Sequence, residues 1–315
     1  MILASNYYKK DCYWAHMITF RCNGGCKYCI NLARGCMARY PEMSGAQMVE
    51  FWNSIENHEG KALSIIGGEP TLHKDFEEMV AGMSGYDVTV TSNLATKFYE
   101  DPNFPSYLRS KSPLRMNTTF HPSAPVTPAL FAERIFMMRD SGINVGQVAM
   151  VKPPNDFDIT KWKDEFASAG LNVDEVTFLG FWTEGNGYFN DSDMKPDNLW
   201  PKDDIDMHLL TKVCGIDSLE HYRAQCGMPQ DSVVEWSCNN GMKTLLVAPD
   251  GTVHECHYKL YQNVDGVGNV LTGDWEHQTK PRQCMHFGKC IGCDVPRTSG
   301  LDWRKHNVID PGGHE

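Results

Sequence analysis

The sequence predicts an α/β fold built on a parallel sheet, because strand-like and helix-like segments alternate along the chain. Apolar runs rich in β-branched residues alternate about six times with stretches in which apolar residues recur at helical spacing. Strands that alternate with helices in this way are joined by right-handed crossovers and lie parallel. The expected strands are 13–20, 62–66, 88–91, 115–120, 145–151 and 175–181, and the expected helices between them are 46–57, 76–83, 128–140 and 160–169.

Length and composition describe an ordinary globular chain. Its 315 residues suffice for a barrel-like domain and a smaller one, and 41% are hydrophobic. No apolar run approaches the ~20 residues of a membrane helix, and residues 1–10 lack the apolar core of a signal peptide. The net charge of −11 opposes a nonspecific hold on nucleic acid. Twelve cysteines in metal-type spacings indicate a reducing compartment, so we expect a cytoplasmic protein without a membrane partner.

Three cysteines follow the first expected strand. They lie in the run Arg21-Cys22-Asn23-Gly24-Gly25-Cys26-Lys27-Tyr28-Cys29. Three thiolates leave one iron of a four-iron, four-sulfur cluster with open positions, where a small molecule can bind the metal. The two glycines allow a short loop to wrap a bulky cluster without Cβ clashes. Taken alone, three close cysteines are also typical of a zinc knuckle half-site.

The second expected strand ends in Gly67-Gly68-Glu69-Pro70. Glycines at a strand end allow the backbone to approach a ligand closely, and the carboxylate of Glu69 can pair with an ammonium group. Taken alone, the glycine pair is equally typical of a plain turn.

Together, these two motifs resemble those of the radical S-adenosylmethionine (SAM) enzymes. The cysteine spacing, the aromatic residue before the last cysteine and a Gly-Gly-Glu-Pro about forty residues later carry the resemblance. It implies a partial six-stranded (βα) TIM-type barrel, with ligands at the carboxyl ends of the strands. The implied catalytic cluster ligands are Cys22, Cys26 and Cys29, and the implied SAM-binding residues are Tyr28, Gly67, Gly68, Glu69 and Pro70.

Polar residues also close the third and fourth expected strands. Thr91-Ser92-Asn93 ends the third, and His121-Pro122-Ser123 ends the fourth. By the same resemblance, Ser92 and Asn93 are candidate contacts to the SAM ribose or carboxylate, and His121 is a candidate contact to SAM or substrate. Turn formation explains these residues nearly as well.

The sequence divides into three parts. We expect the barrel over residues 1–185, a linker or substrate-facing insert over 186–235 with a short helix at 204–213, and a cluster-binding domain over 236–315. Phe181-Trp182-Thr183-Glu184 follows the sixth expected strand and is a candidate pocket lining, although Trp182 fits packing between domains equally well.

The C-terminal part contains a second set of cysteines. Asp250-Gly251 lies between β-rich runs and predicts a two-residue hairpin, which folds Cys256 back towards the side from which Cys238 enters. Cys290-Ile291-Gly292-Cys293 adds two thiolates from one turn. Four such thiolates can hold zinc or an iron–sulfur cluster.

This C-terminal pattern resembles the SPASM and twitch extensions of radical SAM enzymes, which hold auxiliary four-iron clusters. The cysteines are too few for the two clusters of SPASM, so the one-cluster twitch form fits better. It implies that Cys238, Cys256, Cys290 and Cys293 bind a second 4Fe-4S cluster, with Cys284 as a substitute ligand or a residue near the substrate. The remaining cysteines are expected to be buried apolar residues, of which one would donate a hydrogen atom in an epimerase; they are Cys12, Cys36, Cys214 and Cys226.

The resemblance implies an oxidoreductase that cleaves SAM reductively to a 5′-deoxyadenosyl radical, which takes hydrogen from a small polar substrate. The auxiliary cluster would accept the substrate electron, and a flavodoxin- or ferredoxin-type protein would supply the first one. Three alternatives stay open: a peptide-modifying enzyme, an epimerase, and a noncatalytic zinc or iron–sulfur protein.

Overall fold

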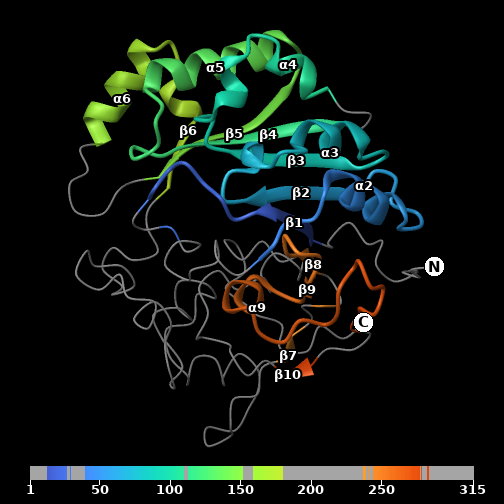
Figure 1. Cartoon of the computed structure of the whole chain (residues 1–315). Helices are drawn as coiled ribbons and strands as arrows, with labels where there is room; N and C mark the ends of the chain where they lie inside the picture. The colour runs from blue at the N-terminus through green and yellow to red at the C-terminus, as the bar shows by residue number, and fades with distance from the viewer. Residues whose placement is uncertain are drawn as a thin grey trace, which may run out of the picture.

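The computed structural model describes residues 13–26, 29, 40–109, 113–151, 159–179, 237–238, 241, 244–276, 278 and 282–283. In this part of the chain, eight strands form one sheet in the order β6-β5-β4-β3-β2-β1-β8-β9 (Figure 1). The strands are β1 (Tyr13–Thr19), β2 (Ala62–Gly67), β3 (Asp87–Ser92), β4 (Leu114–Phe120), β5 (Asn144–Val151), β6 (Val176–Leu179), β8 (Thr244–Val247) and β9 (Val253–His254).

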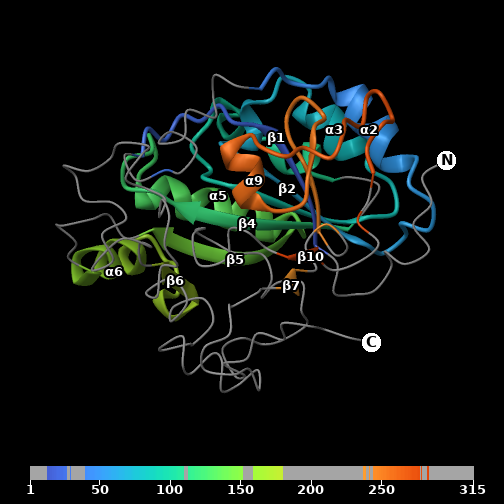
Figure 2. The same ribbon diagram turned by 90° about the horizontal axis from the view of Figure 1, so that it is seen from below.

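The helices of the repeating units cover one face of this sheet, whereas α9 (His257–Gln262) lies on the other (Figures 1 and 2). Consecutive strands pair in parallel from β1 to β6, and each is joined to the next by a crossover on the same face. This confirms the predicted α/β class with a parallel sheet. The helices are α2 (Gly45–Asn53), α3 (Phe76–Gly82), α4 (Phe104–Tyr107), α5 (Pro128–Asp140) and α6 (Ile159–Ser168), with short 3-10 turns η2 (Pro70–Leu72), η3 (Lys97–Glu100) and η4 (Val173–Glu175).

Strand β1 separates two hydrophobic cores, because its side chains alternate between the faces of the sheet. Trp14 and Ile18 belong to the large core under the helices. Ala15 and Met17 belong to a smaller core that includes Leu260 of α9. Burying one such aliphatic or aromatic side chain contributes roughly 1.5–3 kcal/mol. The cysteine loop thus follows a strand that is fixed from both sides.

The predicted C-terminal hairpin is present, but its turn is longer than expected. The backbone N–H of Gly251 donates to the carbonyl of Ala248 at 2.9 Å, and that of Ala248 donates to the carbonyl of Thr252 at 2.8 Å. Gly251 has a φ of +86°, so the loop is a three-residue turn closed by a left-handed glycine rather than a two-residue Asp-Gly turn. Strand β8 pairs in parallel with β1, and the hairpin therefore extends the barrel sheet.

A second, two-stranded sheet joins β7 (Ser237–Cys238) to β10 (Arg282–Gln283) in antiparallel pairing. Both expected domain boundaries and the expected helix at 204–213 fall on or beside residues outside the described ranges, so they stay predictions. None of the described helices has the length and apolar character needed to cross a membrane.

Candidate functional site

The loop after β1 brings the sulfurs of Cys22 and Cys26 close to Gly24. A Cβ atom on Gly24 would lie 3.2 Å from Sγ of Cys26 and 3.5 Å from Sγ of Cys22. A side chain here would crowd the sulfur of Cys26 and touch that of Cys22, so glycine gives the Cys26 sulfur more room. The backbone N–H of Gly24 donates to Sγ of Cys22 at 3.4 Å, and that of Cys29 donates to the carbonyl of Cys26 at 2.9 Å.

The electrostatics of the loop favour a neutral thiol on Cys22 when no metal is bound. The pKa of Cys22 is raised to about 11, mainly by burial and to a smaller extent by the charges of Glu69, Cys29 and Cys26, against the opposing hydrogen bond from the N–H of Gly24. A metal would have to displace this proton, as thiolate-ligated metals do. Among the described residues no three ligand side chains converge as they would on a single metal ion. Cys22, Cys26 and Cys29 are free thiols on one loop, and thiolates are the ligands of iron–sulfur clusters, so the chemistry of the donor set fits such a cluster.

Glu69 lies at the end of β2 with its side chain fully buried. Its carboxylate accepts hydrogen bonds from the backbone N–H of Asn93 at 2.7 Å and from the hydroxyl of Ser92 at 2.8 Å. Thr71 donates its hydroxyl at 2.6 Å and its N–H at 3.2 Å. Burial raises the pKa of Glu69, and these hydrogen bonds oppose that rise. In this structure the carboxylate joins the end of β2 to the end of β3.

The glycines before Glu69 permit a close approach, but to the protein's own chain. A Cβ on Gly67 would lie 2.1 Å from the carbonyl oxygen of Thr19, and one on Gly68 would lie 2.3 Å from that of Arg21. The N–H of Gly68 donates to Thr19 at 2.7 Å, and that of Glu69 donates to Arg21 at 2.8 Å. The glycine motif therefore holds the segment that leads into Cys22.

Asn93 connects Glu69 to the cysteine loop. Its side-chain amide donates to Oδ1 of Asn23 at 2.9 Å and to Sγ of Cys22 at 3.8 Å, and its Oδ1 accepts from the N–H of Ala95 at 2.8 Å. The side chain is buried, with 5% of the residue exposed. Ser92, its neighbour, accepts from the hydroxyl of Tyr99 at 2.8 Å. Both predicted SAM contacts are thus engaged with protein atoms here.

The end of β4 reaches the same loop. The hydroxyl of Ser123 lies 2.9 Å from Sγ of Cys26 and donates to it. His121 is partly buried, and burial lowers its pKa to about 4, so the imidazole is neutral at physiological pH. The sequence predicted a ligand contact for His121 but not the hydrogen bond of Ser123 to Cys26. Both residues showed the same signal, a polar side chain just after the end of a strand.

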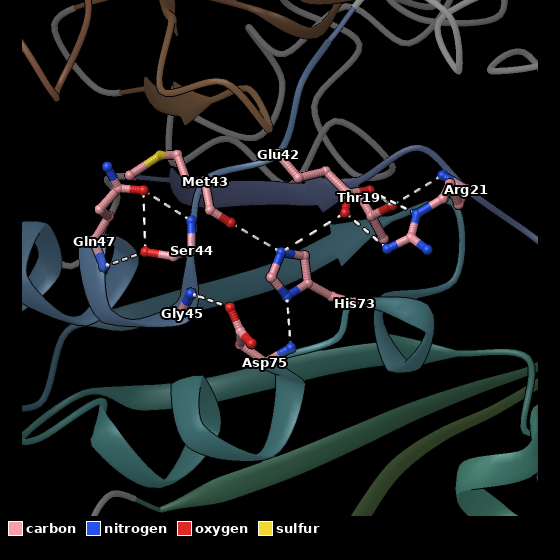
Figure 3. A network of polar contacts seen from close by, with 9 residues as sticks. All are labelled: Thr19, Arg21, Glu42, Met43, Ser44, Gly45, Gln47, His73 and Asp75. Carbon is pink, nitrogen blue, oxygen red and sulfur yellow. Dashed lines mark hydrogen bonds and ion pairs between the residues drawn. The ribbon is translucent and has the colours of Figure 1, made fainter.

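A polar network closes the two ends of the cysteine loop (Figure 3). The guanidinium of Arg21 donates to both carboxylate oxygens of Glu42, at 2.9 and 2.7 Å, and the hydroxyl of Thr19 also donates to Glu42. Burial raises the pKa of Glu42, but the bonds from Arg21 and Thr19 outweigh it, and the net shift is downward. His73 accepts from the N–H of Asp75 at Nδ1, so its Nε2 carries the proton and donates to the carbonyl of Met43 at 3.0 Å. No sequence signal marked Glu42.

The structure describes only part of the predicted second site. Cys238 lies in β7, where its backbone pairs with Arg282, and Cys256 is the N-cap residue of α9. The other predicted residues lie outside the described ranges: Cys12, Tyr28, Cys36, Phe181, Trp182, Glu184, Cys214, Cys226, Cys284, Cys290 and Cys293.

No protein-family model matches the sequence, and no curated protein matches it. Among solved structures, Streptococcus suis SuiB bound to the precursor peptide SuiA is similar with a TM-score of 0.50 and 13% identity, over 83% of this chain and 63% of that one. anSMEcpe with bound AdoMet and Cp18Cys peptide has a TM-score of 0.45 and 13% identity, over 82% and 77%. BtrN in complex with AdoMet and 2-DOIA has a TM-score of 0.39 and 15% identity, over 83% and 79%.

At this level of identity the likeness to SuiB concerns the fold, and this chain spans 63% of the length of SuiB. The parallel order of β1 to β6 with helices on one face agrees with it. The chain therefore has an α/β partial-barrel fold similar to that of SuiB, with its cysteine loop at the carboxyl end of the first strand.

Proposed function

We propose that this protein is a radical SAM enzyme whose site cluster binds to Cys22, Cys26 and Cys29. One observation carries the proposal: Asn93 after β3 and Ser123 after β4 donate hydrogen bonds to the sulfurs of Cys22 and Cys26 in the loop after β1. When bound, the cluster and SAM supply one-electron cleavage of SAM to a 5′-deoxyadenosyl radical. The chain supplies the binding, the orientation and the exclusion of water.

Glu69 is the centre of the proposed SAM site. Its buried carboxylate has one oxygen with three donors and a second oxygen with a single donor, the N–H of Asn93. A carboxylate oxygen accepts more than one hydrogen bond, so Glu69 keeps capacity for the SAM ammonium. Around it we place the remaining proposed SAM contacts, which are Tyr28, Gly67, Gly68, Pro70, Ser92, Asn93 and His121.

For the second site we propose an auxiliary 4Fe-4S cluster on Cys238, Cys256, Cys290 and Cys293. The pairing of Cys238 with Arg282 supports it, because this pairing brings the β10 backbone beside the first of these cysteines. Arg282 precedes Cys284 by two positions in the sequence, which keeps Cys284 as a substitute ligand. A cluster ligated by four thiolates has no open iron, which favours electron transfer and net oxidation of the substrate.

We propose a small polar molecule as the substrate, a flavodoxin- or ferredoxin-type protein as electron donor and a reducing, cytoplasmic setting. A peptide substrate is the second candidate, because the SuiB structure is a complex with a precursor peptide. Product analysis with a candidate peptide and with a small-molecule library would separate them.

Metal analysis tests the proposal. Protein purified without oxygen should contain roughly eight irons and eight sulfides per chain if two cubane clusters are present. A Cys22→Ala, Cys26→Ala, Cys29→Ala variant should keep about half of both. Zinc in place of iron, or an unchanged iron content in the triple variant, would instead support a noncatalytic metalloprotein.

A further inference from the structure

Two side chains outside the cysteine loop donate hydrogen bonds to its sulfurs. Ser123 follows β4 and reaches Sγ of Cys26 at 2.9 Å, and Asn93 follows β3 and reaches Sγ of Cys22 at 3.8 Å. We propose that Ser123 and Asn93 are positioning residues that hydrogen-bond the cluster-ligating sulfurs and raise the reduction potential of the site cluster. This inference rests on the proposed function.

Each of the two donors is held by hydrogen bonds of its own segment. Asn93 is fixed by its own N–H, which donates to the carboxylate of Glu69 at 2.7 Å, and by its Oδ1, which accepts from Ala95 at 2.8 Å. Ser123 lies in the turn after β4, where the N–H of Ala124 donates to the carbonyl of His121 at 2.8 Å. Strands β3 and β4 are neighbours in parallel register, so the residues that follow them lie on one edge of the sheet.

The direction of the effect follows from charge. Reduction adds one electron to a cluster that already carries thiolate charge, and part of that electron density falls on the sulfurs. An O–H or N–H donor stabilises the more negative state more strongly, so it raises the potential. Glu69 acts in the opposite sense, because its carboxylate adds negative charge near Cys22. Ser123 and Asn93 offset this repulsion at the two sulfurs they contact.

Of the two residues, Ser123 gives the cleaner test. Its bond to Cys26 is shorter, and it is exposed, so its loss should disturb packing little. Asn93 also bonds to Asn23 and Ala95, and its replacement would alter the shape of the loop as well. Ser123→Thr keeps a hydroxyl and serves as the rescue variant. Ser141→Ala serves as the matched control, because Ser141 is the C-cap residue of α5, at the opposite end of that helix from Ser123.

The experiment is a redox titration of the anaerobically purified full chain, without SAM, followed by electron paramagnetic resonance. The signal of the site cluster is identified by its absence in Cys26→Ala. Ser123→Ala should lower the midpoint potential by an amount equal to about a tenfold change in the one-electron equilibrium, or about 59 mV. Ser123→Thr and Ser141→Ala should match the wild type, and iron content should be equal in all three.

The outcomes separate this inference from the proposed function. If the wild type has no signal that depends on Cys26, the proposed function fails. If that signal is present but Ser123→Ala leaves its potential unchanged, the inference fails and the proposed function stands. If Ser123→Ala holds no cluster while Ser123→Thr does, the hydroxyl serves assembly, and the role in setting the potential is overturned.

Discussion

Glu69 is fully buried, and its carboxylate is surrounded by donors from three residues. Replacing it with glutamine keeps the size but turns one acceptor oxygen into an N–H donor. That N–H would face an existing donor, either the backbone of Asn93 or the hydroxyls of Ser92 and Thr71. All of these neighbours donate, so the end of β2 requires a side chain with two acceptor oxygens, which a carboxylate provides.

Glu69→Gln should lower the free energy of unfolding by about 1–3 kcal/mol, since a buried donor is left without an acceptor. It should also weaken SAM binding by roughly tenfold or more, because the charge partner of the ammonium is lost. Urea unfolding and SAM titration measure the two effects. Glu50→Gln, exposed on α2, is the matched control. If neither stability nor SAM affinity changed, Glu69 would be only a turn-forming residue, and its proposed role in SAM binding would be contradicted.

Gly67 is a second residue whose role rests on contact geometry. Gly67→Ala should destabilise the fold by more than Gly60→Ala, although both glycines have positive φ, 153° and 70°. A Cβ on Gly67 meets the backbone oxygen of Thr19, whereas nothing lies within 4 Å of one on Gly60. Gly60→Ala should cost about 1–2 kcal/mol from its left-handed conformation alone. Equal losses in thermal unfolding of the two variants would contradict the close approach of β2 to the end of β1.

Strand β1 and helix α2 meet at a buried histidine. His16 is fully buried, and its Nδ1 accepts a hydrogen bond from the indole N–H of Trp52 at 3.0 Å. Because an indole can only donate, protonation of Nδ1 would break this bond. Burial is the main cause that lowers the pKa of His16 to about 3.

This pKa predicts acid lability. In the folded state His16 stays neutral, whereas in the unfolded chain it takes up a proton near its ordinary pKa of 6.5. Its contribution is complete above pH 6.5 and is lost as the pH falls towards about 3, by up to about 1.4 kcal/mol per pH unit. His16→Asn, whose amide oxygen can accept from Trp52, should flatten the dependence of unfolding free energy on pH below 6.5. An unchanged slope would contradict the buried neutral histidine.

Helix and strand boundaries followed local signals where these were strong. Helix α5 begins and ends as predicted, because Thr127 caps its first turn and Pro128 suits the first helical position. Helix α2 ends at Asn53, before the predicted residue 57, and Asn57 cannot extend the helix because its φ of 54° is left-handed. Helix α9 was not predicted: it has six residues, and its N-cap Cys256 makes no side-chain capping bond.

Contacts between distant segments could not be predicted. The parallel pairing of β8 with β1 joins residues about 230 positions apart, and no local pattern encodes it. For the candidate site, the sequence order placed Glu69, Ser92 and Asn93 at strand ends. The hydrogen bonds between these residues could not be predicted from the sequence, because they depend on the pairing and register of β2 and β3. Glu42 follows a stretch with no structural signal, and only the fold brings it to Arg21.

At the scale of the whole molecule, the two cysteine sets should act as separate clusters. A Cys290→Ala, Cys293→Ala variant should lose about half of its iron, on the basis of two equal clusters. It should still cleave some SAM, because the proposed ligands of the site cluster, in the loop after β1, are unchanged. It should form no product. Iron analysis and product assays check both results. A variant that keeps all its iron and loses a zinc ion would remove the auxiliary cluster and the oxidative reaction with it.

The most direct test of the account is SAM cleavage by the reduced, anaerobically purified chain. The wild type should convert SAM to 5′-deoxyadenosine, measured by liquid chromatography and mass spectrometry. Cys26→Ala should abolish the conversion, because Cys26 is a proposed ligand without which the site cluster cannot assemble. Ser141→Ala should leave it intact. Cleavage that persists in Cys26→Ala would contradict the assignment of the site cluster to Cys22, Cys26 and Cys29.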